Sequence, residues 1–273
     1  MARIRVTPEI LEQAVREYIK TNKRIQAESA RGYGHEVGTK LEKYSYDMLQ
    51  EGLPHIRRQI KTYWPHDFLN ELQTFHQMRS LDHTKITSDA WWCKLLLPGN
   101  PKNKNYMPTQ SMGADLVCHY GDGLADVDGV ILVNVKSRNT ERSGRDPNII
   151  SAYKLLTYFA DMCNAYPTNG RLDEIKYWVL GFEHKSGLIQ NAYVKDLFKL
   201  DVSKMPRVNF DSAMQIQWHV SKMDVLPDQT TRKFMSNFTK KFNNDWIFHT
   251  QKRNKHIQKR TNSIKKSLQA DGI

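Results

Sequence analysis

The chain has 273 residues and carries 41 lysines and arginines against 29 acidic residues, which gives a net charge of +12. This length allows one elaborated domain with a sizeable core, and the basic excess suits a phosphate backbone, although ribosomal and membrane-surface proteins are equally basic. The lack of a membrane-length apolar run, of a signal peptide and of CxxC-spaced cysteines predicts a cytoplasmic protein without membrane spans, disulfides or a zinc site.

The N-terminal part of the chain is predicted to begin with two helices. Thr7 precedes Pro8 as an N-cap would, and the apolar positions that follow recur at helical spacing as far as Ile19. A second helix is expected from about His35 to Glu51, after a stretch broken by glycines. Between Leu53 and Met112 the pattern is mixed and favours no single element type.

The rest of the chain alternates between strand and helix patterns. Alternating apolar and polar residues predict strands at 114–120 and 129–137. Further elements are expected as a helix at 149–165, strands at 176–182, 187–194 and 214–220, and a long helix from about Thr230. In that last helix Phe234, Phe238 and Phe242 lie four residues apart, which favours core packing over a platform for base stacking.

The segment beyond Gln251 is strongly basic. Its only acid is Asp271, and its lysines and arginines are Lys252, Arg253, Lys255, Lys259, Arg260, Lys265 and Lys266. Such a tail either follows a phosphate backbone or is solvated and disordered, and composition leaves both interpretations open.

The two predicted strands at 114–120 and 129–137 bring an acid, an amide and a lysine together. Because strand side chains alternate, Asn134 and Lys136 share one face, whereas Val133 and Val135 point into apolar packing. Asp115, on the preceding strand, is expected beside them. An aspartate, a short gap, then Asp or Glu, any residue and lysine form the active site of the PD-(D/E)xK nuclease superfamily, although a half-buried hairpin with solvent-facing polar residues gives the same pattern.

Three further blocks of sequence carry a more specific resemblance. They are DPNIISAYKL at 146–155, AMQIQWHV at 213–220 and, upstream, His35, Gly38, Leu41–Lys43 and Tyr46. Through these blocks, taken in order from about residue 35 to residue 245, the chain resembles the HincII/HindII-type restriction endonucleases. The resemblance is specific in the two long blocks and loose in the segment from Leu53 to Met112.

This resemblance implies an α/β fold with a restriction-endonuclease-like core, in which helices flank a mixed central β-sheet. It implies a single endonuclease domain over residues 1–250, with an N-terminal helical extension, followed by the basic tail at 251–273. The expected activity is that of a type II restriction endonuclease that hydrolyses phosphodiester bonds at a short palindromic duplex DNA site with Mg2+. Two-fold symmetric DNA favours a homodimer, and a cognate DNA methyltransferase is expected in the same bacterial restriction-modification system.

The chemistry assigns roles to three of these residues. Phosphodiester hydrolysis requires a metal that lowers the pKa of a water molecule and a cation near the attacked phosphate. Asp115 offers a hard oxygen ligand of the kind that Mg2+ prefers. Lys136 would hold or help to deprotonate the attacking water, or stabilise the pentavalent phosphorus, and by resemblance the carbonyl of Val135 is a further metal ligand.

Asn134 departs from the family pattern, which has aspartate at this position. Asparagine keeps a carbonyl oxygen for the metal but removes a negative charge, so metal binding should weaken. Three accounts remain open: an engineered isosteric knock-out, a natural site that borrows another acid, or a sequence-specific DNA-binding protein with a degenerate nuclease site. The candidate replacement acids are Asp126, Asp128 and Glu42.

Target reading is expected in the loop between the catalytic strand and the helix that follows it. The DNA-binding candidates in this loop are Arg142, Ser143, Arg145 and Asn148. By resemblance, Asn148 contacts bases, Arg145 takes the place of a residue that enters the minor groove, and Asn209 is a second base-contacting position. Asn148 is also a suitable N-cap for the following helix, and both roles are compatible.

Overall fold

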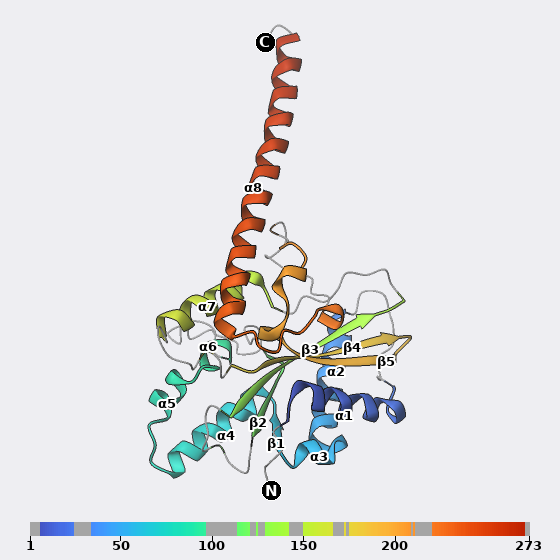
Figure 1. The fold of residues 1–273 in the computed structure, drawn as a ribbon, viewed down its shortest axis with the longest axis vertical. Coiled ribbons are helices and arrows are strands. Elements are labelled where there is room, and N and C mark those ends of the chain that lie inside the picture. Colours follow the sequence, from blue (N-terminus) through green and yellow to red (C-terminus); the bar gives the residue numbers. More distant parts are fainter. Residues whose placement is uncertain are drawn as a thin grey trace.

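A mixed five-stranded sheet in the order β1-β2-β3-β4-β5 forms the centre of the computed structural model (Figure 1). The structure describes residues 6–24, 34–96, 114–120, 124, 129–141, 150–165, 172, 175–208, 210 and 220–270. The strands are β1 Ile60–Tyr63, β2 Leu116–Tyr120, β3 Val130–Asn139, β4 Tyr177–Lys185 and β5 Leu188–Asp196. This sheet with its helices confirms the predicted α/β class.

The pairing of the strands explains why the sheet is mixed. The pairs β1-β2, β2-β3 and β4-β5 are antiparallel, whereas β3 and β4 run parallel. A parallel pair needs a crossover connection, and α7, Ala152–Ala165, lies in the segment between these two strands. Strands β4 and β5 are joined by a tight turn at Ser186 and Gly187, both with positive φ, as the right-handed twist of a hairpin requires.

Helices α1, Pro8–Thr21, and α2, Gly34–Asp47, pack on one face of the sheet, where they share a core with β3 and β5. In α1 the side chain of Thr7 accepts a hydrogen bond from the Ile10 amide, and every fourth residue from Leu11 to Ile19 is buried. The segment Met48–Gly52 continues α2 as a π-helix, so the second predicted helix is confirmed.

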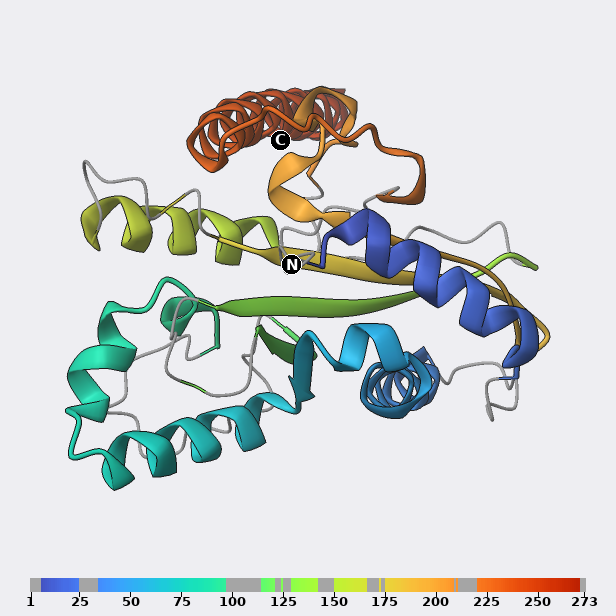
Figure 2. The same cartoon turned by 60° about the horizontal axis from the view of Figure 1, so that its bottom comes forward.

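The opposite face of the sheet carries the larger core, formed with α4, α6, α7 and the start of α8. Figure 2 shows α7 and α8 on one side of the strands and α2 on the other. The remaining helices are α3 Pro54–Arg57, α4 Pro65–Met78, α5 His83–Asp89, α6 Cys93–Leu96, α8 Thr231–Ala270 and 3-10 turns at Leu197–Lys199, Val202–Lys204 and Val220–Lys222. Strand β1 and helices α3 to α6 lie in the segment for which the sequence predicted no single element type.

Helix α8 has 40 residues and projects far from the body of the molecule (Figure 1). Phe234 and Phe238 are buried and Phe242 packs against the same core, which confirms that they are core residues. The basic segment from 251 continues the same helix to Ala270. Within the described residues, no helix combines the length and apolar character needed to cross a bilayer. The strand expected at 214–220 falls outside the described residues, apart from Val220 at the start of a 3-10 turn.

Candidate active site

Strands β2 and β3 bring the predicted catalytic residues together. Val133 and Val135 are buried in the core that β3 shares with α2, which confirms that these two valines lie on the apolar face. In the antiparallel register Leu116 is opposite Val133, and the Asp115 amide donates to the Val133 carbonyl at 3.0 Å. Continuing the register by one residue places Asp115 opposite Asn134, as expected.

The Asp115 carboxylate is held by two groups from β3. Its Oδ2 accepts a hydrogen bond of 2.7 Å from the Val135 amide and lies 3.9 Å from Nζ of Lys136. Burial raises the pKa of Asp115 above its ordinary value, and the lysine and the amide oppose this only in part. The site thus contains a desolvated carboxylate, whose charged form a bound cation would stabilise.

Asn134 is buried, with 4% of its surface exposed. Its Nδ2 donates a hydrogen bond of 3.0 Å to the hydroxyl of Tyr177 on β4. Burial, with the nearby charge of Asp115, raises the pKa of Tyr177 well above its ordinary value, so the hydroxyl is neutral at physiological pH. Tyr177 was not identified from the sequence, because it pairs with β3 only through the parallel register of β3 and β4.

Lys136 and Asp115 are both partly exposed, with 21% of each side chain accessible. Two residues further along the same face of β3, Arg138 forms an ion pair of 3.7 Å with Glu183 of β4. The two residues are also partners in the parallel register. The face of β3 that carries Asn134 therefore continues as a row of polar and basic side chains, a suitable surface for an anionic backbone.

The donors at this cluster suit Mg2+ in kind but supply little charge. A carboxylate oxygen of Asp115, an amide oxygen of Asn134 and the carbonyl of Val135 are all hard oxygen ligands. Only the first is anionic, and among the described residues no group of three or more histidine, cysteine, aspartate or glutamate side chains is placed to hold a metal. A magnesium ion would therefore fit the donor types with one negative charge fewer than the aspartate-containing pattern provides.

The structure places one of the three candidate replacement acids. Glu42 lies on α2, whose neighbouring Leu41 is buried with Val133 and Val135, on the other side of β3 from Asn134. Asp126 and Asp128 lie outside the described residues.

The predicted DNA-reading residues all fall outside the described residues, but the structure describes the residues on either side of them. Arg142, Ser143, Arg145 and Asn148 belong to 142–149, between β3 and α7. Asn209 is also outside, and its neighbours on both sides contact α8. The Val208 amide donates to Asp245 Oδ2 at 3.0 Å, and the Phe210 ring packs edge-on against Phe242 and Trp246.

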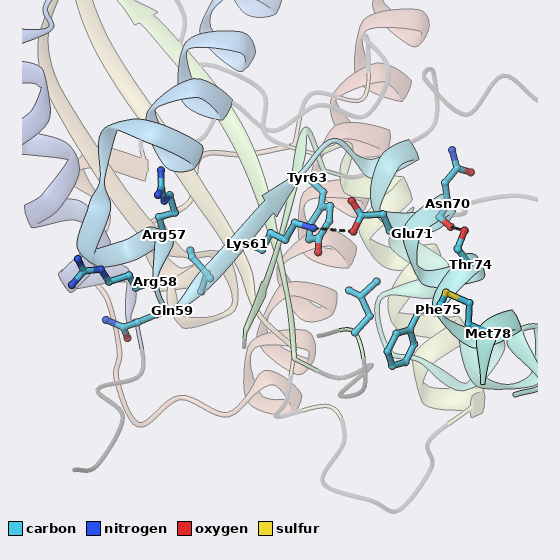
Figure 3. A pocket seen from close by; sticks show the side chains of 12 residues that line it. Arg57, Arg58, Gln59, Lys61, Tyr63, Asn70, Glu71, Thr74, Phe75 and Met78 are labelled. Atoms are coloured by element: carbon cyan, nitrogen blue, oxygen red, sulfur yellow. Dashed lines mark hydrogen bonds and ion pairs between the residues drawn. The ribbon is translucent and has the colours of Figure 1, made fainter. Parts of the chain in front are cut away.

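A hollow of about 670 Å³ lies elsewhere, between β1 and α4 (Figure 3). Lys61 of β1 bridges to Glu71 of α4 at 2.9 Å within it, and Arg57 and Arg58 stand at its edge. Its lining does not include Asp115, Asn134 or Lys136, so it is separate from the candidate active site.

Comparison with known proteins connects this site to one family. The family model described as restriction endonuclease HincII matches residues 122–268, a range that includes Asn134 and Lys136 and begins after Asp115. Two relatives from Haemophilus influenzae, described as the type II restriction enzymes HindII and HincII, are each 28% identical, over 224 and 222 residues. Each match covers 77% of this chain and 80% of the relative. The chain belongs to the HincII restriction endonuclease family.

Proposed function

We propose that this protein is a type II restriction endonuclease that hydrolyses phosphodiester bonds in duplex DNA with Mg2+. The observation that carries the proposal is the pairing at 3.9 Å of Asp115, the residue before β2, with Lys136 of the neighbouring strand β3, in a chain of the HincII family. The same two residues would serve as metal ligand and as phosphate-side cation in a PD-(D/E)xK nuclease.

Each residue of the cluster has a distinct role in this proposal. Asp115, the Asn134 amide oxygen and the Val135 carbonyl would hold Mg2+, which when bound supplies an activated water and neutralises developing charge. Lys136, partly exposed beside Asp115, would orient the attacking water and stabilise negative charge on the phosphate. The Val135 amide fixes the Asp115 carboxylate, so the ligand is positioned before DNA binds.

The substitution at position 134 lowers the expected activity of this chain. A buried neutral amide replaces an anion beside the metal position, and no described cluster of three or more acidic, histidine or cysteine side chains compensates for it. We therefore propose weak Mg2+ affinity and slow cleavage. The same observation supports the second candidate function, a sequence-specific DNA-binding protein with a degenerate nuclease site.

Target recognition is proposed to rest on Arg142, Ser143, Arg145, Asn148 and Asn209. A palindromic site has two equivalent strands, so a homodimer would supply one active site to each strand. A cognate DNA methyltransferase would then protect the host chromosome, and the proposed setting is the bacterial cytoplasm. Sedimentation of the DNA complex would test the stoichiometry of two chains per duplex.

One experiment separates the two candidate functions. The target is first selected from a randomised duplex pool by binding without Mg2+, and single-turnover cleavage of that duplex is then followed with Mg2+. Slow, metal-dependent cutting that disappears in Lys136→Ala supports the nuclease. Specific binding without any cutting, even at high enzyme and metal concentration, supports the binding protein. Failure to select any sequence would contradict both.

A further inference from the structure

The outer half of α8 is a single exposed helix of one charge sign. Every residue from 251 to 269 is exposed, and the helix continues unbroken to Ala270. This stretch contains no acidic residue, so all the formal charges within it are positive. At about 1.5 Å per residue, it extends roughly 30 Å.

Four of the seven charged side chains on this stretch of helix form one row. Lys252, Lys255, Lys259 and Lys266 are separated by three, four and seven residues, which places them in one row along the helix. Arg253 and Arg260 lie roughly a third of a turn from this row, and Lys265 lies roughly a third of a turn from it in the other direction. A different side presents Ile257, Ile264 and Leu268, all exposed. The row of lysines is here called the α8 basic face and is defined by Lys252, Lys255, Lys259 and Lys266.

The inner half of α8 contacts the residues next to Asn209, the second predicted base-contacting position. The Asp245 carboxylate accepts a hydrogen bond from the Val208 amide and forms an ion pair of 2.8 Å with Lys241. The guanidinium of Arg207 lies 3.8 Å from the centre of the Phe248 ring. On the other side of Asn209 the Phe210 ring packs against Trp246, so residues on both sides contact α8 within two turns of Lys252, where the α8 basic face begins.

We propose that the α8 basic face binds the sugar-phosphate backbone of duplex DNA outside the recognition site. The inference rests on the proposed function, in which duplex DNA is the substrate and Asn209 contacts it. A duplex carries one negative charge per about 1.7 Å, so a row of lysines that extends over roughly 20 Å has a matching partner along the flanking DNA. Duplex DNA is a better partner for this face than a second copy of the helix, because two positively charged helices would repel each other.

Comparing the affinities for a short and a long duplex distinguishes binding to the flanking DNA from binding to the recognition site. The full chain is titrated against two duplexes with the same central target, one of about 12 base pairs and one of about 40, which leaves room for the roughly 30 Å helix on either side. The test variant carries Lys252→Gln, Lys255→Gln, Lys259→Gln and Lys266→Gln. The matched control removes the same charge from exposed lysines elsewhere, by Lys20→Gln, Lys40→Gln, Lys43→Gln and Lys85→Gln.

The parent and the control should bind the long duplex at least about tenfold more tightly than the short one, and the test variant should lose this gain. Each phosphate that a lysine neutralises adds about 0.9 to the slope of log affinity against log salt, so the slope on the long duplex should fall in the test variant by roughly 3 to 4 for each chain, or about 7 for the proposed homodimer. Circular dichroism checks that the variant keeps its helix.

Equal affinities of the parent for both duplexes, an equal loss for test and control variants, or a lower oligomeric mass in the test variant alone would overturn the inference. If the parent binds neither duplex, the proposed function itself fails.

Discussion

The amide of Asn134 donates a hydrogen bond to the hydroxyl of Tyr177 over 3.0 Å, inside the core of the sheet. A tyrosine hydroxyl can either accept or donate a hydrogen bond, so it can also donate to a carboxylate in the same place. The Tyr177 hydroxyl can therefore serve as a hydrogen-bond partner for an aspartate at position 134 as well as for an asparagine. The missing charge is a property of this one side chain and does not follow from the geometry around it.

Replacing Asn134 by aspartate is expected to raise the rate of DNA cleavage by orders of magnitude. The second anion next to Asp115 should tighten Mg2+ binding, and metal-assisted activation of water depends on that binding. Single-turnover cleavage of the target duplex as a function of Mg2+ concentration measures both effects. In the Asn134→Asp background, Lys136→Ala should abolish cutting without a change in DNA affinity larger than a few fold. Full-speed cutting by the parent chain would show that another acid completes the site.

Tyr177→Phe should destabilise the parent chain, because a buried amide loses a hydrogen-bond acceptor, at a cost of about 1–3 kcal/mol. A double-mutant cycle with Asn134→Ala isolates the interaction between the two side chains. The free energy of unfolding from urea titration should show a coupling energy of about 1 kcal/mol. Additive effects of the two substitutions would mean that this hydrogen bond contributes nothing to stability.

Local periodicity was enough to predict one side of the site, and its limits are equally clear. The alternation of β3 placed Asn134 and Lys136 together because side-chain direction in a strand depends only on neighbouring residues. Tyr177 was missed because its contact with Asn134 spans 43 residues and depends on parallel pairing of β3 with β4. Pairing register depends on tertiary packing, which a single sequence does not display.

The structure of the basic segment beyond Gln251 could not be predicted from its composition either. Its composition left a phosphate-tracking arm and a disordered tail open, and the structure shows residues 251–270 as the continuation of α8. The stretch contains no glycine or proline to end the helix, so a long helix is compatible with the sequence. Charge alone does not report this, because charged runs occur in helices and in disordered chains alike.

Asp115→Asn should stabilise the folded protein at neutral pH while abolishing cleavage. The pKa of Asp115 is raised in the folded state by burial, so the charged form opposes folding. Below about pH 3.9, the pKa of an aspartate in the unfolded chain, Asp115 is protonated in both states and does not oppose folding. As pH rises through the higher pKa of Asp115 in the folded protein, the free energy of unfolding decreases. Urea unfolding without Mg2+ should therefore give a larger free energy of unfolding for the variant at pH 7, with the difference vanishing in acid. A less stable variant at pH 7 would contradict the assigned cause.

Asn148→Ala tests the reading loop that joins β3 to α7. Removing a bidentate hydrogen bond to a base should cost about 1–3 kcal/mol of binding free energy on the target duplex and leave affinity for random DNA almost unchanged. Parallel titrations of both duplexes provide the measurement. An equal decrease on both, or a drop in thermal stability, would identify Asn148 as a helix cap and not a base-contacting residue.

Asp245→Ala tests whether α8 supports the segment that carries Asn209. The substitution removes the acceptor of the buried Val208 amide and the partner of Lys241, so the Arg207–Phe210 segment should loosen at a cost of about 1–3 kcal/mol. If Asn209 contacts bases, affinity for the target should fall more than affinity for random DNA, because the α8 basic face still binds the phosphate backbone. Lys241→Ala is the matched control, since it removes the ion pair but leaves the acceptor of Val208 in place. Discrimination between target and random DNA that is unchanged in Asp245→Ala would show that α8 does not position this segment for base reading.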